Sequence, residues 1–510
     1  MPPKTTSDRV LQFIPGFITW SVLLSPILLA RPMPLAIAFF ITFVTVFWVY
    51  RAFVHSVGMI VGYRKYLTYV DEDWYKRFLD LNPEELPDSQ QLPSDLSQLK
   101  HLIVTPVVNE NMQVLEGTFR GVATQTFPQK NIYFAISVEE KYHKTVRKTI
   151  QELQEKYPQV KNLWIFVHPS GLPGEVRGAS TNRTWGARNA VERIQSMGMD
   201  IDDFLVTTMD GDAVLSPQYL ALLSYEYACK HEREDHFFST ALYLTNNNIW
   251  DVPTLMRIQA NSVTLATLSD WVMEPFFKET FSNFSLSLRT LVEAEYWDTT
   301  ISIDDTTLFW RIFNNRHGKF RGAPLYVPVS SDAVQGKTFV GSHVQQYKQL
   351  LRWGWGIITF PMAVRSLLAA KKLSISEKLL WAYYFLERFA IWYTIIILIT
   401  FGFPLILLFN PGFRSSTFAF LLPQITSTLL TVALLFLVPA AWFRQKLTPP
   451  MPKDWSWWKR TLIVFEGVLV IIHLFTYVFF PFVQAQTQFM FGKRMEKFEF
   501  TPKFRSDKKN

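Results

Sequence analysis

Cysteine is almost absent from this sequence, since Cys229 is the only one among 510 residues. An internal disulfide is therefore excluded, and so are zinc sites built on pairs of cysteines. We interpret Cys229 as a small apolar core residue. The nine histidines show no ligand spacing, so we expect none of them to bind a metal.

Charged residues are scarce as well, at 18% of the chain against 49% hydrophobic residues. This composition is apolar for a soluble enzyme but too polar for a uniform membrane bundle, so the apolar residues must be segregated. The net charge is +8. A basic balance can indicate nucleic-acid binding. In a chain with membrane segments it indicates a basic cytoplasmic face instead, and we expect no nucleic-acid partner.

Long apolar runs supply this segregation. Five of them approach the ~20 residues that a spanning helix needs, at residues 13–30, 35–57, 389–409, 415–443 and 461–491. The alternative, buried helices of a soluble protein, fits runs of this length poorly. Because a second apolar run follows the first at once, we interpret the amino-terminal segment as an anchor rather than a cleaved signal peptide.

The positions of lysine and arginine predict the orientation. Basic clusters follow the second and fourth runs, whereas the loop between the third and fourth has only Arg414. The positive-inside rule then places the large middle region in the cytoplasm, and we expect an integral protein of the plasma membrane. A full fifth span would put the basic residues after 491 outside. The last run therefore either spans the membrane, or is re-entrant or interfacial and bent at Pro481.

The composition divides the chain into six parts. They are two transmembrane helices (1–60), a linker (61–99), a soluble domain (100–355), interfacial amphipathic helices (356–388), about three membrane segments (389–491) and a basic cytoplasmic tail (492–510). The linker contains a stretch rich in proline, serine and acidic residues at 79–98, which is typical of an irregular connection.

Strand and helix patterns alternate in the soluble domain. Strand-like runs at 101–108, 132–140, 163–169 and 203–210 are separated by helical patterns at 112–125, 142–157 and 182–195. This order predicts an α/β domain with a Rossmann-like, mostly parallel sheet. Such sheets bind ligands at the carboxyl ends of their strands. Polar clusters fall there, at 105–110, 138–140 and 210–212.

The cluster Asp210-Gly211-Asp212 ends an apolar strand. Two carboxylates there suit a hard divalent cation such as Mg²⁺ or Mn²⁺, which takes oxygen ligands from carboxylates and substrate phosphates. We expect Gly211 to permit a tight turn of the backbone. The alternative is that Asp212 only caps a helix that begins near Ser216 or Pro217.

These features together resemble a membrane-integrated glycosyltransferase of family 2 with the GT-A fold, the group that includes cellulose, chitin and hyaluronan synthases. The resemblance covers roughly residues 100–355, with the flanking spans and the tail. Five segments carry it in the family's order, namely "TPVVNE" (105–110), "DGD" (210–212), "SIDDTTLFWRI" (302–312), "QLLRW" (349–353) and "FEFTPK" (498–503).

The resemblance implies a role for each segment. It implies a nucleotide sugar, by family habit a UDP-sugar, as the donor, and a divalent metal on Asp210 and Asp212. It makes Asp305 the catalytic base and Asp304 its neighbour. The residues that it implies for donor binding or for the gating loop are Thr105, Pro106, Asn109, Glu110, Glu139, Asn182, Asp210, Gln349, Arg352, Trp353, Thr501 and Lys503.

The sequence departs from the family at two positions, and several residues keep a second interpretation. The family usually has an aspartate at the end of the second strand, where this sequence offers Glu139 or Glu140. Ala179 stands where many relatives have a lysine, so that Arg177, Arg183 or Arg188 would supply the charge. Asp304 and Asp305 can cap the helix that follows them, and we expect Asp304 to do so. Further alternatives assign Arg352 and Trp353 to anchoring at the membrane interface, and Thr501 and Lys503 to a basic membrane-surface tail.

Three functions remain open. The first is an inverting glycosyltransferase that forms β-linkages, most simply a processive polysaccharide synthase whose partners are the donor, the growing chain and membrane lipids. The second is a transferase of single sugars to a lipid-linked acceptor, because about five spans are few for a sealed pore unless the chain forms a homo-oligomer. The third is a non-catalytic scaffold that retains the fold.

Overall fold

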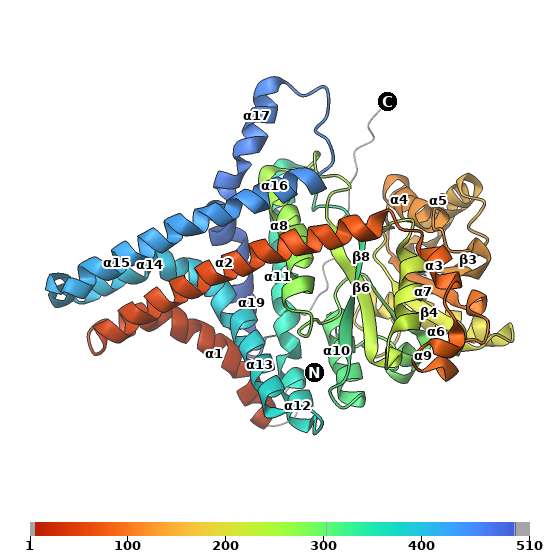
Figure 1. The fold of residues 1–510 in the computed structure, drawn as a ribbon, viewed down its shortest axis with the longest axis horizontal. Helices are drawn as coiled ribbons and strands as arrows, with labels where there is room; N and C mark the ends of the chain where they lie inside the picture. Colours follow the sequence, from red (N-terminus) through yellow and green to blue (C-terminus); the bar gives the residue numbers. More distant parts are fainter. Residues whose placement is uncertain (1–5, 302, 494, 496–510) are drawn as a thin grey trace.

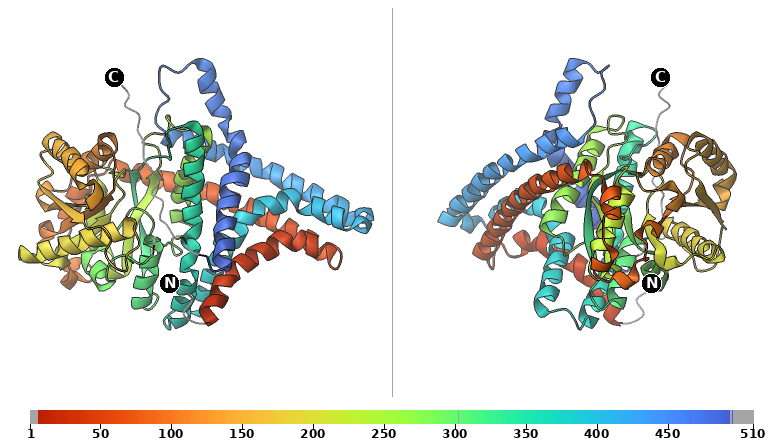
Figure 2. Two further views of the ribbon diagram at one scale, coloured as in Figure 1. Left: turned by 180° about the vertical axis from the view of Figure 1, so that it is seen from behind. Right: turned by 45° about the vertical axis from the view of Figure 1, so that its right-hand side comes forward.

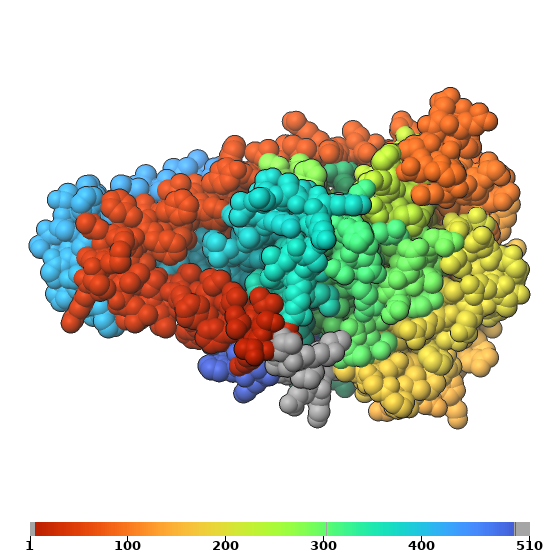
Figure 3. All heavy atoms as spheres, turned by 90° about the horizontal axis from the view of Figure 1, so that it is seen from below, coloured from red at the N-terminus to blue at the C-terminus, as the bar shows by residue number. Residues whose placement is uncertain are grey.

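The computed structural model describes residues 6–301, 303–493 and 495. An α/β domain lies at one end of an elongated molecule, and long helices extend from it toward the other end (Figure 1). Seen from below, the amino-terminal helices and residues 417–447 lie together at the end opposite the domain (Figure 3).

The domain is built on one sheet in the order β3-β2-β1-β4-β7-β6-β8-β5. Its strands are β1 (Lys100–Val107), β2 (Ile132–Glu139), β3 (Asn162–His168), β4 (Phe204–Thr208), β5 (Val214–Leu215), β6 (His236–Leu244), β7 (Phe284–Ser287) and β8 (Arg321–Ser330). The first four strands pair in parallel, as does β6 with β8, whereas β7 and β5 pair antiparallel with their neighbours. The predicted α/β fold with a mostly parallel sheet, flanked by long apolar helices, is confirmed.

Helices cover both faces of the sheet. The helices of this domain and its flanks are α3 (Trp74–Leu79), α4 (Met112–Ala123), α5 (His143–Lys156), α6 (Ala179–Ser196), α7 (Tyr219–Cys229), α8 (Thr254–Met273), α9 (Leu288–Glu293), α10 (Asp305–Asn315), α11 (Phe339–Gly354) and α12 (Phe360–Ala369). Alternate residues of a strand point to opposite faces. Leu102 and Val104 of β1 accordingly pack with α6 and α10, whereas Ile103 and Val107 pack with α4, α5 and α7.

Five described helices are long and apolar enough to cross a membrane. They are α1 (Thr6–Leu28), α2 (Pro34–Val70), residues 375–409 with α13 (Ile375–Leu386) and α14 (Trp392–Phe409), residues 417–447 with α15 (Thr417–Ala433) and α16 (Leu437–Leu447), and residues 457–490 with α17 (Trp457–Phe465), α18 (Val470–His473) and α19 (Phe480–Met490). The tips after α1 and α14 lie side by side, because Asn410 donates to the carbonyl of Ala30 at 2.8 Å.

Two boundaries differ from the sequence-based division. The second helix ends at Val70 rather than near residue 60, so the expected linker begins inside α2. The third begins at Ile375 rather than near 389, because its charged residues have partners. Arg388 pairs with Glu279, and Glu387 lies 2.7 Å from Arg51. The interpretation of Cys229 as a core residue is wrong, since it lies exposed at the last position of α7.

Glycines set how closely α2 approaches the domain. Gly58 and Gly62 are four residues apart, so both face α8. A Cβ atom on Gly62 would lie 2.4 Å from the carbonyl oxygen of Leu268, and one on Gly58 would lie 2.3 Å from Ser269 Oγ. The amino-terminal anchor and the domain therefore form one packed unit.

We expect Gly62→Ala to destabilise the protein, because the backbone of α8 cannot move aside as a flexible side chain can. Overpacking of this kind costs about 1–3 kcal/mol, which thermal unfolding in detergent would show as a fall of several degrees. Gly467→Ala is the matched control, because a Cβ there meets no atom within 4 Å. Equal unfolding temperatures for the two variants would contradict the close contact.

Candidate active site

A cavity of about 730 Å³ opens at the carboxyl ends of the parallel strands. Most of the predicted site residues line it, namely Pro106, Asn109, Glu110, Glu139, Asp210, Asp212, Asp304, Asp305, Gln349, Arg352 and Trp353. Thr105 and Asn182 are buried beside it and do not line it. Thr501 and Lys503 lie outside the described residues.

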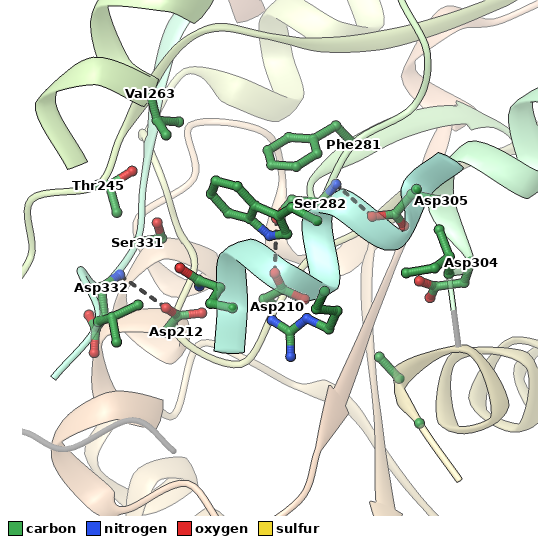
Figure 4. Close-up of a pocket in the computed structure, with 18 of the residues that line it drawn as sticks. Asp210, Asp212, Thr245, Val263, Phe281, Ser282, Asp304, Asp305, Ser331 and Asp332 are labelled. Carbon is green, nitrogen blue, oxygen red and sulfur yellow. Dashed lines mark hydrogen bonds between the residues drawn. The ribbon is translucent and has the colours of Figure 1, made fainter. Parts of the chain in front are cut away.

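The acidic pair after β4 faces this cavity (Figure 4). The backbone N–H of Asp210 donates to Asn283 Oδ1 at 3.0 Å, and the N–H of Asp332 donates to Asp212 Oδ2 at 3.0 Å. The next helix, α7, begins at Tyr219 and has Gln218 at its N-cap position. Asp212 therefore does not cap a helix, and its carboxylate belongs to the cavity.

Glycine occupies position 211 for a different reason from the tight turn that we expected. It does not adopt the left-handed conformation that favours glycine. A Cβ atom on it would lie 3.3 Å from the carboxylate carbon of Glu110, and its carbonyl accepts from Thr118 Oγ1 at 2.8 Å. Glycine here lets the strand end of β4 pack closely against the Glu110 side chain.

Arg183 joins the acidic residues of the site. It lies on α6, and its side chain is only 3% exposed. Its guanidinium donates to Asp210 Oδ1 at 2.7 Å, to Asp304 Oδ2 at 2.5 Å and to Asp305 Oδ1 at 3.1 Å. The three carboxylates raise the pKa of Arg183 despite its burial, so it stays charged.

The structure thus distinguishes the three arginines that the sequence offered as alternatives for the charge of the missing lysine. Arg177 pairs with Glu139 at the surface, at 2.5 Å, and Arg188 lies over the ring of Tyr296 at 5.4 Å. Only Arg183 of these three contacts the acidic cluster. The sequence signal for it was the absent lysine at position 179, which placed a missing positive charge in this region without assigning it to one residue.

Ser282 was missed by the sequence analysis. Its backbone N–H donates to Asp305 Oδ2 at 2.8 Å, and its hydroxyl donates to Asp210 Oδ2 at 2.9 Å (Figure 4). Its φ is 51°, in the left-handed region that costs a non-glycine residue roughly 1–2 kcal/mol. The residue lies in a loop just before β7 and belongs to no recognisable motif. The unusual backbone aims both donors at the two carboxylates.

Asp304 and Asp305 begin α10. Asp304 occupies the N-cap position but makes no side-chain cap bond, because its carboxylate accepts from Arg183. The expectation that Asp304 caps this helix with its side chain is therefore wrong. Burial and the neighbouring Asp304 carboxylate raise the pKa of Asp305 well above its usual range, while Arg183 and the Ser282 N–H oppose this effect.

The raised pKa predicts a pH dependence, if Asp305 must be ionised to accept a proton. Activity should then fall as pH is lowered through the raised pKa of Asp305. We expect Asp304→Asn to shift this acidic limb to lower pH, because it removes a like charge and leaves Arg183 to the remaining carboxylates. Rates measured from pH 4 to 9 would test this, with Asp332→Asn as the control that keeps the limb in place. An acidic limb that stays in place or moves to higher pH in Asp304→Asn would contradict this prediction.

Helix α11 supplies one wall of the cavity. Gln349 follows Gln346 by three residues, and Arg352 and Trp353 follow Gln349 by three and four, so they lie on one helical face. All four line the cavity. Gln346 donates to Gln349 Oε1 at 3.2 Å, and Trp353 packs edge-on against Phe281 with ring centroids 5.9 Å apart. The helical spacing explains why a Q-x-x-R-W pattern can act as a unit.

The strand ends supply the opposite wall. Glu110 turns back to accept from the N–H of Val108 at 2.7 Å, and Glu139 lies at the end of β2. Asn182 instead lies 2.8 Å from His168 Nδ1, at the end of β3, where it supports the wall from behind. Thr105 is fully buried within β1.

Two of the long apolar helices also line the cavity. Phe389 and Tyr393 come from residues 375–409, and Phe482 and Gln486 come from α19. The rings of Tyr393 and Phe482 stack with their centroids 4.2 Å apart. The cavity therefore runs from a carboxylate-rich end at the sheet to an aromatic end among the apolar helices.

The side chains of the cavity suit a metal ion whose ligands come partly from the protein and partly from a substrate. Among the residues that the structure describes, no group of three or more histidine, cysteine or acidic residues is arranged to hold a metal. Asp210 and Asp212 both face the cavity, and each carboxylate has about four lone-pair sites. One or two carboxylates completed by phosphate oxygens are a usual Mg²⁺ site. The residues present fit a metal that binds together with a diphosphate.

No protein-family model and no curated protein matches the chain. Solved structures similar in fold are glycosyltransferases. The mannosyltransferase PcManGT from Pyrobaculum calidifontis, in complex with GDP-Man and Mn²⁺, is 12% identical with a TM-score of 0.34, over 75% of this chain and 99% of that chain. Residues 1–349 of TarS from S. aureus, in complex with UDP-GlcNAc, are 13% identical with a TM-score of 0.33, over 77% of this chain and 92% of that chain.

Proposed function

We propose that this protein is an inverting, membrane-bound glycosyltransferase of family 2 with the GT-A fold. Its donor is a nucleotide diphosphate sugar, a UDP-sugar by family resemblance, and its domain faces the cytoplasm. The observation that carries the proposal is the meeting of Asp210, Asp212, Asp305 and Arg352 in one cavity at the carboxyl ends of the strands.

Asp305 is the proposed catalytic base. It accepts the proton of the acceptor hydroxyl as that oxygen attacks the anomeric carbon. Its raised pKa favours this role, because a base whose pKa approaches the working pH takes the proton more readily than an ordinary carboxylate. Ser282 and Arg183 hold the two Asp305 oxygens in place.

The diphosphate end of the donor lies at the acidic pair and Arg352. Asp210 and Asp212 would hold Mg²⁺ or Mn²⁺, which would supply positive charge against the leaving diphosphate when bound. Arg352 donates a charge-assisted hydrogen bond to a phosphate oxygen. Pro106, Asn109, Glu110 and Glu139 line the neighbouring wall, where the nucleoside would lie.

The product would carry a β-linkage. Attack on the side opposite the leaving group inverts the anomeric carbon, and the usual donors of this family are α-linked. Trp353 and Phe281 offer flat apolar faces for a sugar ring beyond the reacting carbon. Gln346, Gln349 and Gln486 add side-chain amides that can bond sugar hydroxyls.

Two acceptors fit the far end of the cavity. A growing polysaccharide would pass between the apolar helices, which favours a processive synthase. A lipid-linked acceptor would enter from the membrane, and the aromatic end formed by Phe389, Tyr393 and Phe482 supports this second candidate. Product length separates them: a long, water-soluble product supports the synthase, whereas a short, lipid-extractable one supports the single-sugar transferase.

We expect nucleotide binding to depend on the metal. Because the acidic pair alone gives too few ligands for a closed metal site, UDP and Mn²⁺ should each bind weakly alone and at least ~10-fold more tightly together. Calorimetry on the purified protein would measure this, with Asp210→Asn expected to abolish the coupling. A scaffold that only retains the fold would show equal UDP affinity with and without Mn²⁺.

A further inference from the structure

The last apolar segment, residues 457–490, has one acidic residue and one histidine between 461 and 490, and both face the α/β domain. Glu466 is buried and accepts from Arg257 Nε at 3.0 Å, from Thr254 Oγ1 at 3.0 Å and from Arg444 at 3.1 Å. His473 Nε2 lies 2.7 Å from Gln259 Oε1. Since Thr254, Arg257 and Gln259 all belong to α8, this segment is attached to the domain along its middle.

Both ends of the segment also lie against the domain or beside the start of α1. The chain that leads into it is held where Trp250 Nε1 donates to the carbonyls of Pro449 and Pro450 at 3.1 and 3.0 Å. At the other end, Tyr347 of α11 donates to Gln484 at 2.5 Å. A Cβ atom on Gly492 would lie 2.9 Å from Arg9, near the beginning of α1.

These contacts differ from those of the helices that extend away from the domain. The tips after α1 and α14 contact one another far from the domain, as Asn410 and Ala30 show. Residues 457–490 instead run across the base of the long helices α2 and α15, beside α11, in both Figure 1 and the reversed view of Figure 2. A helix in that position cannot share the membrane-crossing direction of α2 and α15.

The outer face of the segment is apolar and exposed. Its large exposed side chains are Trp457, Trp458, Leu462, Val464, Phe465, Val468, Ile471, Ile472 and Phe480. A helix with tryptophan and basic residues near its start and one broad apolar face is typical of a segment that lies in the membrane interface. Lys453 and Lys459 would attract the anionic lipids of the cytoplasmic leaflet.

We propose that residues 457–490 do not span the bilayer but lie in its interface, on the side of the α/β domain. Their outer face inserts into the lipid of that leaflet, and Glu466 and His473 fasten their inner face to α8. The chain then crosses the membrane four times, and Lys493 emerges on the same side as the domain. This placement satisfies the positive-inside rule, which a fifth span violates. It does not depend on the reaction proposed above.

The sidedness of Lys493 tests the proposal in the full chain. Cys229, exposed on α7, is the reference for the domain side. In a Cys229→Ser background, Ser415→Cys marks the tip between the third and fourth helices, and Lys493→Cys marks the end of the last segment. Intact cells would be treated with a membrane-impermeant maleimide, before and after permeabilisation.

We expect Ser415→Cys to react in intact cells, and Cys229 and Lys493→Cys to react only after permeabilisation. Reaction of Lys493→Cys in intact cells, together with Ser415→Cys, would overturn the proposal, because it would show a fifth crossing. Reaction of Ser415→Cys and Cys229 on the same side would overturn it as well, since the third and fourth helices would then not cross.

The depth of the segment gives a second, independent readout. Spin labels at single cysteines from Leu462 to Ile472 would report their relative exposure to oxygen and to a water-soluble collision reagent. An interfacial helix predicts a depth that rises and falls with a period of about 3.6 residues. A depth that increases steadily toward one central maximum would establish a spanning helix and contradict the proposal.

Discussion

Replacing Arg183 by methionine should lower the thermal unfolding temperature by roughly 10 °C and remove measurable sugar transfer. The side chain is almost fully buried, and it is the shared partner of Asp210, Asp304 and Asp305. Removing one member of a buried ionic group costs about 3–5 kcal/mol, and each kcal/mol lowers Tm by about 2–4 °C in a domain of this size. Thermal unfolding in detergent measures the shift.

Three comparisons identify the cause of this loss. Arg188→Met is the matched control on the same helix, since Arg188 is exposed and lies over the ring of Tyr296, and we expect almost no change. Adding Asp304→Asn to Arg183→Met should recover part of the loss by removing one uncompensated carboxylate. Mn²⁺ should stabilise Arg183→Met more than the natural protein, because it brings positive charge to the same cluster. A fall below about 2 °C would contradict the account.

Asp305→Asn should lower the rate of transfer by about 10²- to 10⁴-fold, which is the usual contribution of a general base. Metal-dependent UDP affinity should change little, because Asp210, Asp212 and Arg352 remain. An asparagine oxygen can still accept from the Ser282 N–H, so the loop should keep its place. Steady-state rates and calorimetry on the same preparation would separate the two effects.

In Asp305→Asn the stability against unfolding should stay the same or rise slightly, although the rate of transfer falls. The raised pKa means that the folded state disfavours the ionised carboxylate, so near neutral pH a neutral side chain should be tolerated or slightly stabilising. Asp332→Asn, which changes a second aspartate of the same cavity, is the comparison and should retain most of the rate. A lower Tm together with a small loss of rate would indicate that Asp305 has a structural role instead.

The sequence predicted the parts of this fold that depend on local pattern. The first four strands and the helices between them follow from alternating apolar periods, and their polar ends meet because parallel strands end at one edge. The acidic pair could be assigned to the cavity for the same reason, whereas the Q-x-x-R-W segment, which lies on α11, was assigned by the resemblance to the family. The antiparallel strand β7 is short, and no tight turn joins it to either neighbouring strand. Its insertion between β4 and β6 therefore depends on pairing with strands that are distant in sequence.

Other features depend on partners that are distant in sequence. Arg183 was one of three equivalent arginines until the structure placed it 2.7 Å from Asp210. Ser282 acts through a backbone conformation that no residue pattern encodes. The charges at Glu387 and Arg388 suggested that the third helix begins later than it does, because their partners Arg51 and Glu279 lie on other elements.

The central claim is that the cavity transfers sugar from a nucleotide diphosphate donor. The most direct measurement uses the purified protein in lipid vesicles with Mn²⁺ and a panel of radiolabelled nucleotide sugars, with Asp305→Asn beside it. The account predicts that one donor gives a labelled product that the variant does not make and that chelation of the metal abolishes. No product from any donor, or equal product from the variant, would contradict it.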